Sequence, residues 1–181
     1  MSSATSIPAS PANPSDSPAV YVASPLGFSE IGRRYNTQVI VPQLRTLGYD
    51  VLDPWAEEVS RRLEAARALP YEHAQMSALG RINTELGERN ARLLAKSDAV
   101  LALLDGTDVD SGVASEIGYA CALKRPVVAW RSDLRRAGEN EGTPVNLQVA
   151  YFVSISGGRL TSSFAEALEI LGELMPAPPA S

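Results

Sequence analysis

Short apolar runs alternate with helix-like segments along most of this chain, and this alternation limits the fold more than any other feature. The predicted strands are 20–23, 50–53, 98–104, 126–130 and one within 147–155. The predicted helices lie within 29–47 and over 57–69, 75–96, 112–124 and 162–174. Strands that alternate with helices favour a parallel sheet covered on both faces. We therefore expect an α/β fold, a flavodoxin-like doubly wound five-stranded parallel sheet.

Pro42 constrains the first helical segment. A proline inside a helix removes a backbone donor and clashes with the preceding turn. The segment is therefore expected either to kink at Pro42 or to begin near Val39, and Gly48 is typical of a residue that ends a helix.

The chain of 181 residues is long enough for one domain with a sizeable core, which we place at 19–175. Residues 1–18 are rich in Ser, Pro and Ala, a composition that predicts a disordered tail. Residues 176–181 predict a frayed C-terminus.

The composition argues against several classes of partner. The net charge is −5 and no Lys/Arg cluster is present, so we expect neither a nucleic acid polymer nor a membrane as partner. Cys121 is the only cysteine, which excludes an intrachain disulfide, and no residues have metal-ligand spacing. We expect no cofactor and no metal. The chain shows neither a bilayer-spanning apolar run nor a secretory signal, which predicts a cytoplasmic protein.

The segment 110–120 follows the predicted strand 98–104 and a polar turn, so it predicts a loop that leads into a helix. Ligands of open parallel sheets bind at this edge, outside the carboxyl ends of the strands. Glu116 would lie near the helix N-terminus, where the helix dipole favours an anion. A carboxylate there can attack a carbon that bears a good leaving group. Glu116 is therefore the first catalytic candidate, although a helical glutamate is more often a solvated surface residue.

Asp110 is the second carboxylate of this segment. An aspartate before a helix commonly caps its first N–H groups. Ser111 could provide the cap instead and leave Asp110 to bind a ligand hydroxyl. Gly112 would leave room for that ligand.

The loop after the first strand forms the other half of the predicted site. Right-handed crossovers bring the ends of strands 20–23 and 98–104 together, so their loops share one crevice. Tyr21 and Phe28 would offer ring surface at its rim, and Ser24 would offer a hydroxyl. The spacing fits neither a dinucleotide fingerprint nor a P-loop, so a pyrophosphate ligand is not indicated.

Three segments together resemble the nucleoside 2-deoxyribosyltransferase family. They are 21–29, 110–120 and 144–147, with the sequences YVASPLGFS, DSGVASEIGYA and PVNL. The resemblance covers about residues 19–155 and implies that the chain transfers 2-deoxyribose between nucleobases, with a 2-deoxynucleoside and a free base as substrates.

The resemblance also implies roles for individual residues. Glu116 would be the nucleophile and form a covalent deoxyribosyl ester, which a second base would resolve with net retention. Tyr21 would position Glu116, and Asp110 would bind the sugar 5′-hydroxyl. Asn146 would reach the same hydroxyl from a neighbouring subunit, so the protein would be a homo-oligomer, a dimer or a trimer of dimers.

Asn90 departs from the family pattern. Many members carry an aspartate here, eight residues before the position of Asp98, that contacts and helps to protonate the leaving base. An amide can pair with a base edge through its donor and its acceptor, but it cannot deliver a proton.

Three alternatives remain open from the sequence. One is a hydrolase of 2-deoxynucleoside 5′-monophosphates, which Asp110 disfavours because a carboxylate repels a phosphate at contact distance. The others are a catalytically silent nucleoside-binding module and a flavodoxin-like interaction domain.

Overall fold

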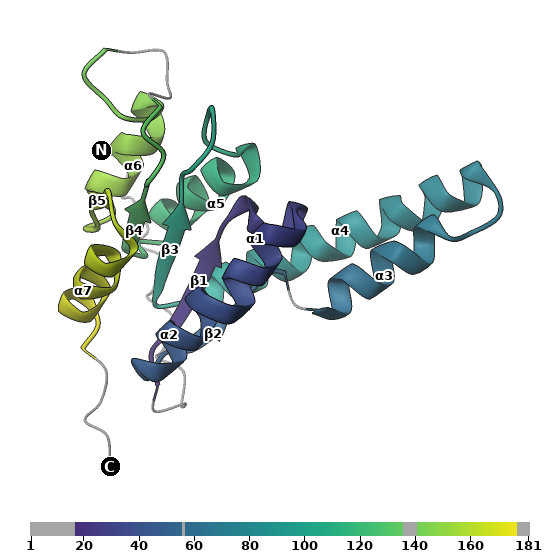
Figure 1. The fold of residues 1–181 in the computed structure, drawn as a ribbon, viewed down its shortest axis with the longest axis horizontal. Helices are drawn as coiled ribbons and strands as arrows, with labels where there is room; N and C mark the ends of the chain where they lie inside the picture. Colours follow the sequence, from purple (N-terminus) through teal and green to yellow (C-terminus); the bar gives the residue numbers. More distant parts are fainter. Residues whose placement is uncertain (1–16, 56, 136–140, 177–181) are drawn as a thin grey trace, which may run out of the picture.

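A computed structural model describes residues 17–55, 57–135 and 141–176. The centre of the fold is a parallel sheet of five strands with the order β2-β1-β3-β4-β5 (Figure 1). The strands are β1 (Ala19–Ala23), β2 (Asp50–Leu52), β3 (Ala99–Leu103), β4 (Val127–Trp130) and β5 (Leu160–Thr161). This strand order is that of flavodoxin-like doubly wound folds, so the expected fold class is confirmed.

Residues along the central strands alternate between two cores, one on each face of the sheet. In β1, Tyr21 and Ala23 join one core and Val20 and Val22 join the other, as the two-residue period of a strand requires. The first core also receives residues of α4 (Glu72–Lys96), α5 (Ser111–Ala122) and α6 (Leu147–Ile155). The second core receives residues of η2 (Asn36–Ile40), α2 (Val41–Thr46) and α7 (Phe164–Leu174). Helices therefore cover both faces, and β1 and β3 are buried between them.

The predicted strand within 147–155 is wrong, because the structure forms helix α6 there. Its β-branched and aromatic residues favour a strand, but Asn146 caps a helix by accepting from the Gln148 and Val149 amides. Val149 and Val153 then bury one side of this helix in the first core. The fifth strand lies further on and has only two residues, too few for a recognisable pattern.

The first helical segment begins earlier than a start near Val39 would require. Ser29 caps helix α1 (Glu30–Tyr35), where its hydroxyl accepts from the Gly32 amide at 3.0 Å. The backbone then forms the wider π turn η2 before it re-enters an α-helix at α2. Pro42 lies in the first turn of α2, where its missing N–H interrupts the regular ladder. A short 3-10 turn, η1 (Pro25–Phe28), joins β1 to this segment.

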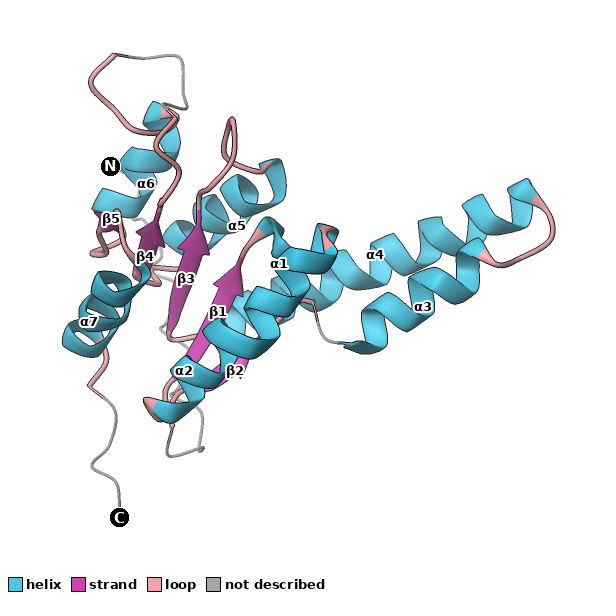
Figure 2. Ribbon diagram, viewed as in Figure 1, coloured by secondary structure: helices cyan, strands magenta, loops and turns pink. Residues whose placement is uncertain are grey.

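Helices α3 (Glu57–Arg67) and α4 form a hairpin that projects away from the sheet (Figure 2). The C-terminal end of α4 packs against the first core through Leu93 and Leu94. The predicted helices in both regions are therefore confirmed, with α4 beginning slightly earlier than expected. No helix of the described ranges is long and apolar enough to cross a membrane. The predicted tail at 1–18 falls almost entirely outside the described residues, as does the predicted end at 176–181.

Candidate active site

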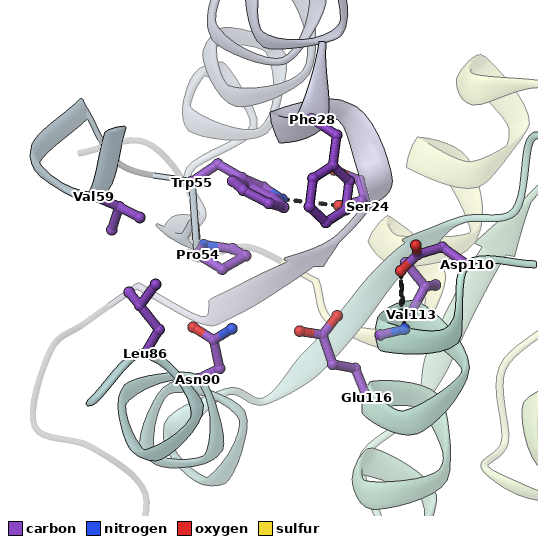
Figure 3. Close-up of a pocket in the computed structure, with 11 residues that line it drawn as sticks. Ser24, Phe28, Pro54, Trp55, Val59, Leu86, Asn90, Asp110, Val113 and Glu116 are labelled. Atoms are coloured by element: carbon purple, nitrogen blue, oxygen red, sulfur yellow. Dashed lines mark hydrogen bonds between the residues drawn. The ribbon is translucent and has the colours of Figure 1, made fainter. Parts of the chain in front are cut away.

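A pocket of about 190 Å³ opens where the loops after β1 and β3 meet at the carboxyl edge of the sheet. Residues from both loops line it, as the predicted shared crevice requires. The root of the α3–α4 hairpin closes the remaining side (Figure 3). The lining residues are Ser24, Phe28, Pro54, Trp55, Val59, Leu86, Asn90, Asp110, Gly112, Val113 and Glu116.

Glu116 is fixed by a buried tyrosine. The Tyr21 hydroxyl donates to Glu116 Oε1 at 2.5 Å, across a sequence separation of 95 residues. Tyr21 belongs to β1 and is fully buried, so it offers no ring surface to the rim, contrary to that sequence expectation. Its hydroxyl contacts the glutamate, and the Glu116 carboxyl lies in the pocket between Asn90 and Asp110 (Figure 3).

This environment changes the acidity of both groups. Burial raises the pKa of Glu116 from 4.5 to about 7, and the nearby Asp110 carboxylate raises it further, while the Tyr21 hydrogen bond opposes the rise. Burial and the neighbouring Glu116 raise the pKa of Tyr21 far above its ordinary value. The phenol therefore stays protonated, as a donor to the carboxylate must. A carboxyl group with a pKa near 7 can serve as nucleophile or base at neutral pH.

Asp110 is the N-cap of α5, and the alternative in which Ser111 caps this helix is wrong. Asp110 Oδ1 accepts from the Gly112 and Val113 amides at 2.9 and 3.1 Å. Oδ2 has no hydrogen-bond partner among the described residues, so the carboxylate is held by one oxygen and can offer the other to a ligand. Gly112 lines the pocket beside it.

Two buried oxygen atoms in the pocket have no partner among the described residues. They are Asn90 Oδ1, on α4, and Ser24 Oγ, at the end of β1. Ser24 is only 4% exposed. A buried polar atom without a hydrogen bond is costly, and both residues line the pocket, so these two oxygens are candidates for contact with a ligand.

Two aromatic rings, Phe28 and Trp55, form an aromatic wall of the same pocket. Phe28 and Trp55 meet edge to face with their ring centroids 4.7 Å apart. Phe28 remains 70% exposed, in agreement with its predicted place at the rim. The sequence favours a contribution of segment 54–74 to the base pocket but does not single out Trp55, Pro54 or Val59, and it predicts Leu86 only as a core residue. Trp55 follows strand β2 at the same carboxyl edge, and that position was the available signal.

Asn146 does not line this pocket. It lies at the start of α6 and borders a separate hollow with Asp108, Val109 and Phe152. Within one chain, the structure thus brings together Tyr21, Ser24, Phe28, Asn90, Asp110, Gly112 and Glu116, and leaves Asn146 apart.

The fold and the pocket define an α/β protein with a candidate site at the carboxyl edge of its sheet, built around the Glu116 carboxyl group, whose pKa is raised. The chain belongs to the nucleoside 2-deoxyribosyltransferase family, whose model matches residues 20–148. This membership confirms the resemblance drawn from the three sequence segments and supports an enzyme of the nucleoside 2-deoxyribosyltransferase type.

Solved structures agree with this assignment. A conserved protein from Enterococcus faecalis V583 is 30% identical, with a TM-score of 0.59 over 88% of this chain and 99% of that one. A 2-desoxiribosyltransferase from Leishmania mexicana is 19% identical, with a TM-score of 0.62 over 86% and 97%. A CMP N-glycosidase from Clostridium botulinum is 14% identical, with a TM-score of 0.50 over 87% and 99%. At these last two identities the likeness concerns the fold. No curated protein sequence matches the chain.

Proposed function

We propose that this protein transfers 2-deoxyribose between nucleobases through a covalent ester on Glu116. The observation that carries the proposal is the Glu116 carboxyl, which Tyr21 holds inside the pocket of a chain that belongs to this family. A carboxylate oxygen attacks the anomeric carbon, and the bond from that carbon to the base nitrogen breaks. The bonding electrons leave with the base, which takes a proton from water. A second base then attacks the same carbon, loses its proton and restores the carboxylate.

The two ends of the pocket suit the two parts of a deoxynucleoside. Asp110, with its free Oδ2, would accept the sugar 5′-hydroxyl. Asn90 lies at the other end, between the hairpin root and Glu116, where the base would lie against the aromatic wall (Figure 3). The unpartnered Asn90 Oδ1 would accept an N–H of the base edge.

Charge favours a nucleoside over a nucleotide as substrate. The described lining contains two carboxyl groups, those of Asp110 and Glu116, and no Lys, Arg or His. A 5′-phosphate beside Asp110 would be repelled by about 1 kcal/mol per charge pair in water and by more where water is excluded. Hydrolysis of a nucleoside monophosphate, the reaction named for the Clostridium botulinum neighbour, is therefore the second candidate.

A second copy of the chain would complete the site. Helix α6 carries no charged residue, and Leu147, Tyr151 and Ile155 form an exposed apolar row at i, i+4 and i+8. Asn146 begins this helix. Packing of a second copy on the row would cover it and would carry Asn146 toward the neighbouring pocket.

The deciding experiment incubates the protein with a 2-deoxynucleoside, with and without a second free base, and separates the products by chromatography. A new deoxynucleoside that forms only with the acceptor base supports transfer. Free deoxyribose regardless of acceptor indicates hydrolysis, and faster turnover of the 5′-monophosphate would overturn the substrate assignment. Absence of turnover, with binding detected by calorimetry, would indicate a silent nucleoside-binding module.

A matched pair of variants tests the nucleophile. Glu116→Ala removes the attacking carboxylate, so turnover and the mass of a covalent sugar adduct on the intact protein should both disappear. Glu88→Ala removes an exposed glutamate of α4 and should leave both unchanged. Normal turnover in Glu116→Ala would contradict the mechanism.

A further inference from the structure

Arg89 ties the turn that carries Trp55 to α4. The Arg89 guanidinium donates through Nη1 to the Pro54 carbonyl at 3.1 Å and through Nη2 to the Asp53 carbonyl at 3.3 Å. These two carbonyls belong to the residues immediately before Trp55. Arg89 does not line the active-site pocket, but it directly precedes Asn90, which does.

The Asp53 side chain fixes the same turn from inside. Its Oδ1 accepts from the Trp55 amide at 2.8 Å, and its Oδ2 accepts from Asn36 Nδ2 at 2.9 Å. Asn36 is 1% exposed and lies in the π turn η2, whose Ile40 packs in the second core. The turn is therefore bonded to α4 through Arg89 and to η2 through Asn36.

The Trp55 indole ring is also held in place, by a hydrogen bond and by close packing. Trp55 Nε1 donates to the Ser24 carbonyl at 2.9 Å. The ring lies directly on Gly27, where an added Cβ would stand 1.8 Å from Trp55 Cδ2. The orientation of the aromatic wall thus depends on a planar donor at Arg89, an acceptor at Asp53 and the absence of a side chain at Gly27.

We propose that Arg89 is a positioning residue, which orients Trp55 as the wall against which the base of the substrate lies. The proposal rests on the proposed function for what the wall binds, whereas the position of the ring can be measured without substrate. Two donors in a fixed plane are needed to reach two successive carbonyls, a geometry that guanidinium supplies and a lysine ammonium does not. Loss of Arg89 should therefore release the ring and weaken substrate binding more than it slows the chemical step.

The test uses Trp55 as a fluorescent reporter. The sequence contains two tryptophans, and Trp130→Phe leaves Trp55 as the only one while it keeps an aromatic ring in the core. In this background, Arg89→Met keeps an unbranched apolar stem and removes both donors. Acrylamide should quench Trp55 more strongly in Arg89→Met than in the parent, and Arg89→Lys should lie between them. Arg92→Met removes an exposed arginine three residues along the same helix, so its quenching should match the parent.

Kinetics supply the second measurement. Arg89→Met should raise the KM for the deoxynucleoside about tenfold and change kcat by less than about threefold. If Arg89→Met does not fold by circular dichroism, Gly27→Ala displaces the same ring by a different route and should show the same quenching and the same KM effect. Quenching equal to the parent in the folded variant would overturn the proposal. Absence of turnover in every protein, with the expected quenching, would instead count against the proposed function alone.

Discussion

Replacement of Tyr21 by phenylalanine tests the electrostatic argument at the centre of the site. The variant keeps the ring in the first core and removes only the hydroxyl that donates to Glu116 Oε1 at 2.5 Å. A short hydrogen bond to a carboxylate stabilises its ionised form, so it lowers the pKa of Glu116 against the opposing effect of burial. Without the bond, burial and the nearby Asp110 carboxylate act unopposed, so the pKa of Glu116 must rise.

The size of the rise follows from the strength of such bonds. A hydrogen bond to a charged group contributes about 1.5–3 kcal/mol. At about 1.4 kcal/mol per pH unit, this would raise the pKa of Glu116 by about 1–2, from about 7 to about 8–9. At pH 7 about half of the wild-type carboxyl is ionised, against about 1–10% in the variant. We therefore expect kcat/KM to fall about 5- to 50-fold at pH 7 and to recover toward the wild-type value above about pH 9.

The assay is a pH profile of kcat/KM for a single deoxynucleoside between about pH 5 and 10, because this parameter reports ionisations of the free enzyme. Tyr49→Phe is the matched control. It also removes a buried tyrosine hydroxyl, one that donates to the Met175 carbonyl at 3.0 Å, away from the pocket. Its profile should coincide with that of the wild type.

Two results would refute the reasoning. If the acidic limb of Tyr21→Phe stays at the wild-type pH, the hydrogen bond does not set the pKa of Glu116. If the loss is the same at every pH, the hydroxyl acts through geometry and the electrostatic account fails.

Three further predictions concern acidity, base recognition and assembly. The pKa of Glu116 in the folded state, about 7, lies above its ordinary value of 4.5. The free energy of unfolding therefore falls as the pH rises from about 4.5 to about 7. Glu116→Gln should remove that loss and be more stable than wild type by up to about 3 kcal/mol at pH 8, but not at pH 4, in urea denaturation. Asn90→Asp adds an ionisable group at the base end of the pocket and should steepen the pH dependence of kcat/KM for bases that are poor leaving groups. An unchanged pH profile would show that position 90 does not contact the base. Tyr151→Glu puts a charge on the apolar row of α6 and should reduce the mass measured by light scattering and lower activity together, because Asn146 would no longer reach the neighbouring pocket. A variant of wild-type mass would remove this row from the interface.

The sequence predicts the structure correctly where a local pattern of residues determines the element that forms. Buried runs such as 99–103 predicted the central strands, and the segment around Glu116 predicted a carboxylate at the carboxyl edge of the sheet. The juxtaposition of the loops after β1 and β3 followed from the handedness of crossovers alone.

The errors arose where distant contacts outweighed local preference. The residues of α6 favour a strand one by one, but an asparagine cap and burial against the first core make the helix. Local sequence does not decide the cap of α5, because Ser111 fits the position as well as Asp110 does. The sequence does not identify Trp55 as a lining residue because the position of its ring depends on distant residues. These are Arg89, 34 residues away, and Gly27, whose lack of a side chain leaves room for the ring.

The residues of the candidate site come from two separate parts of the chain. Tyr21 and Glu116 are carried by the sheet and its own helix, whereas Trp55 and Asn90 stand at the base of the α3–α4 arm. Under the proposed function, substitutions between positions 53 and 90 could retune which base is accepted while the reacting groups stay untouched. With this separation, substitutions confined to the α3–α4 hairpin and the turn before it would change substrate specificity without altering the catalytic residues.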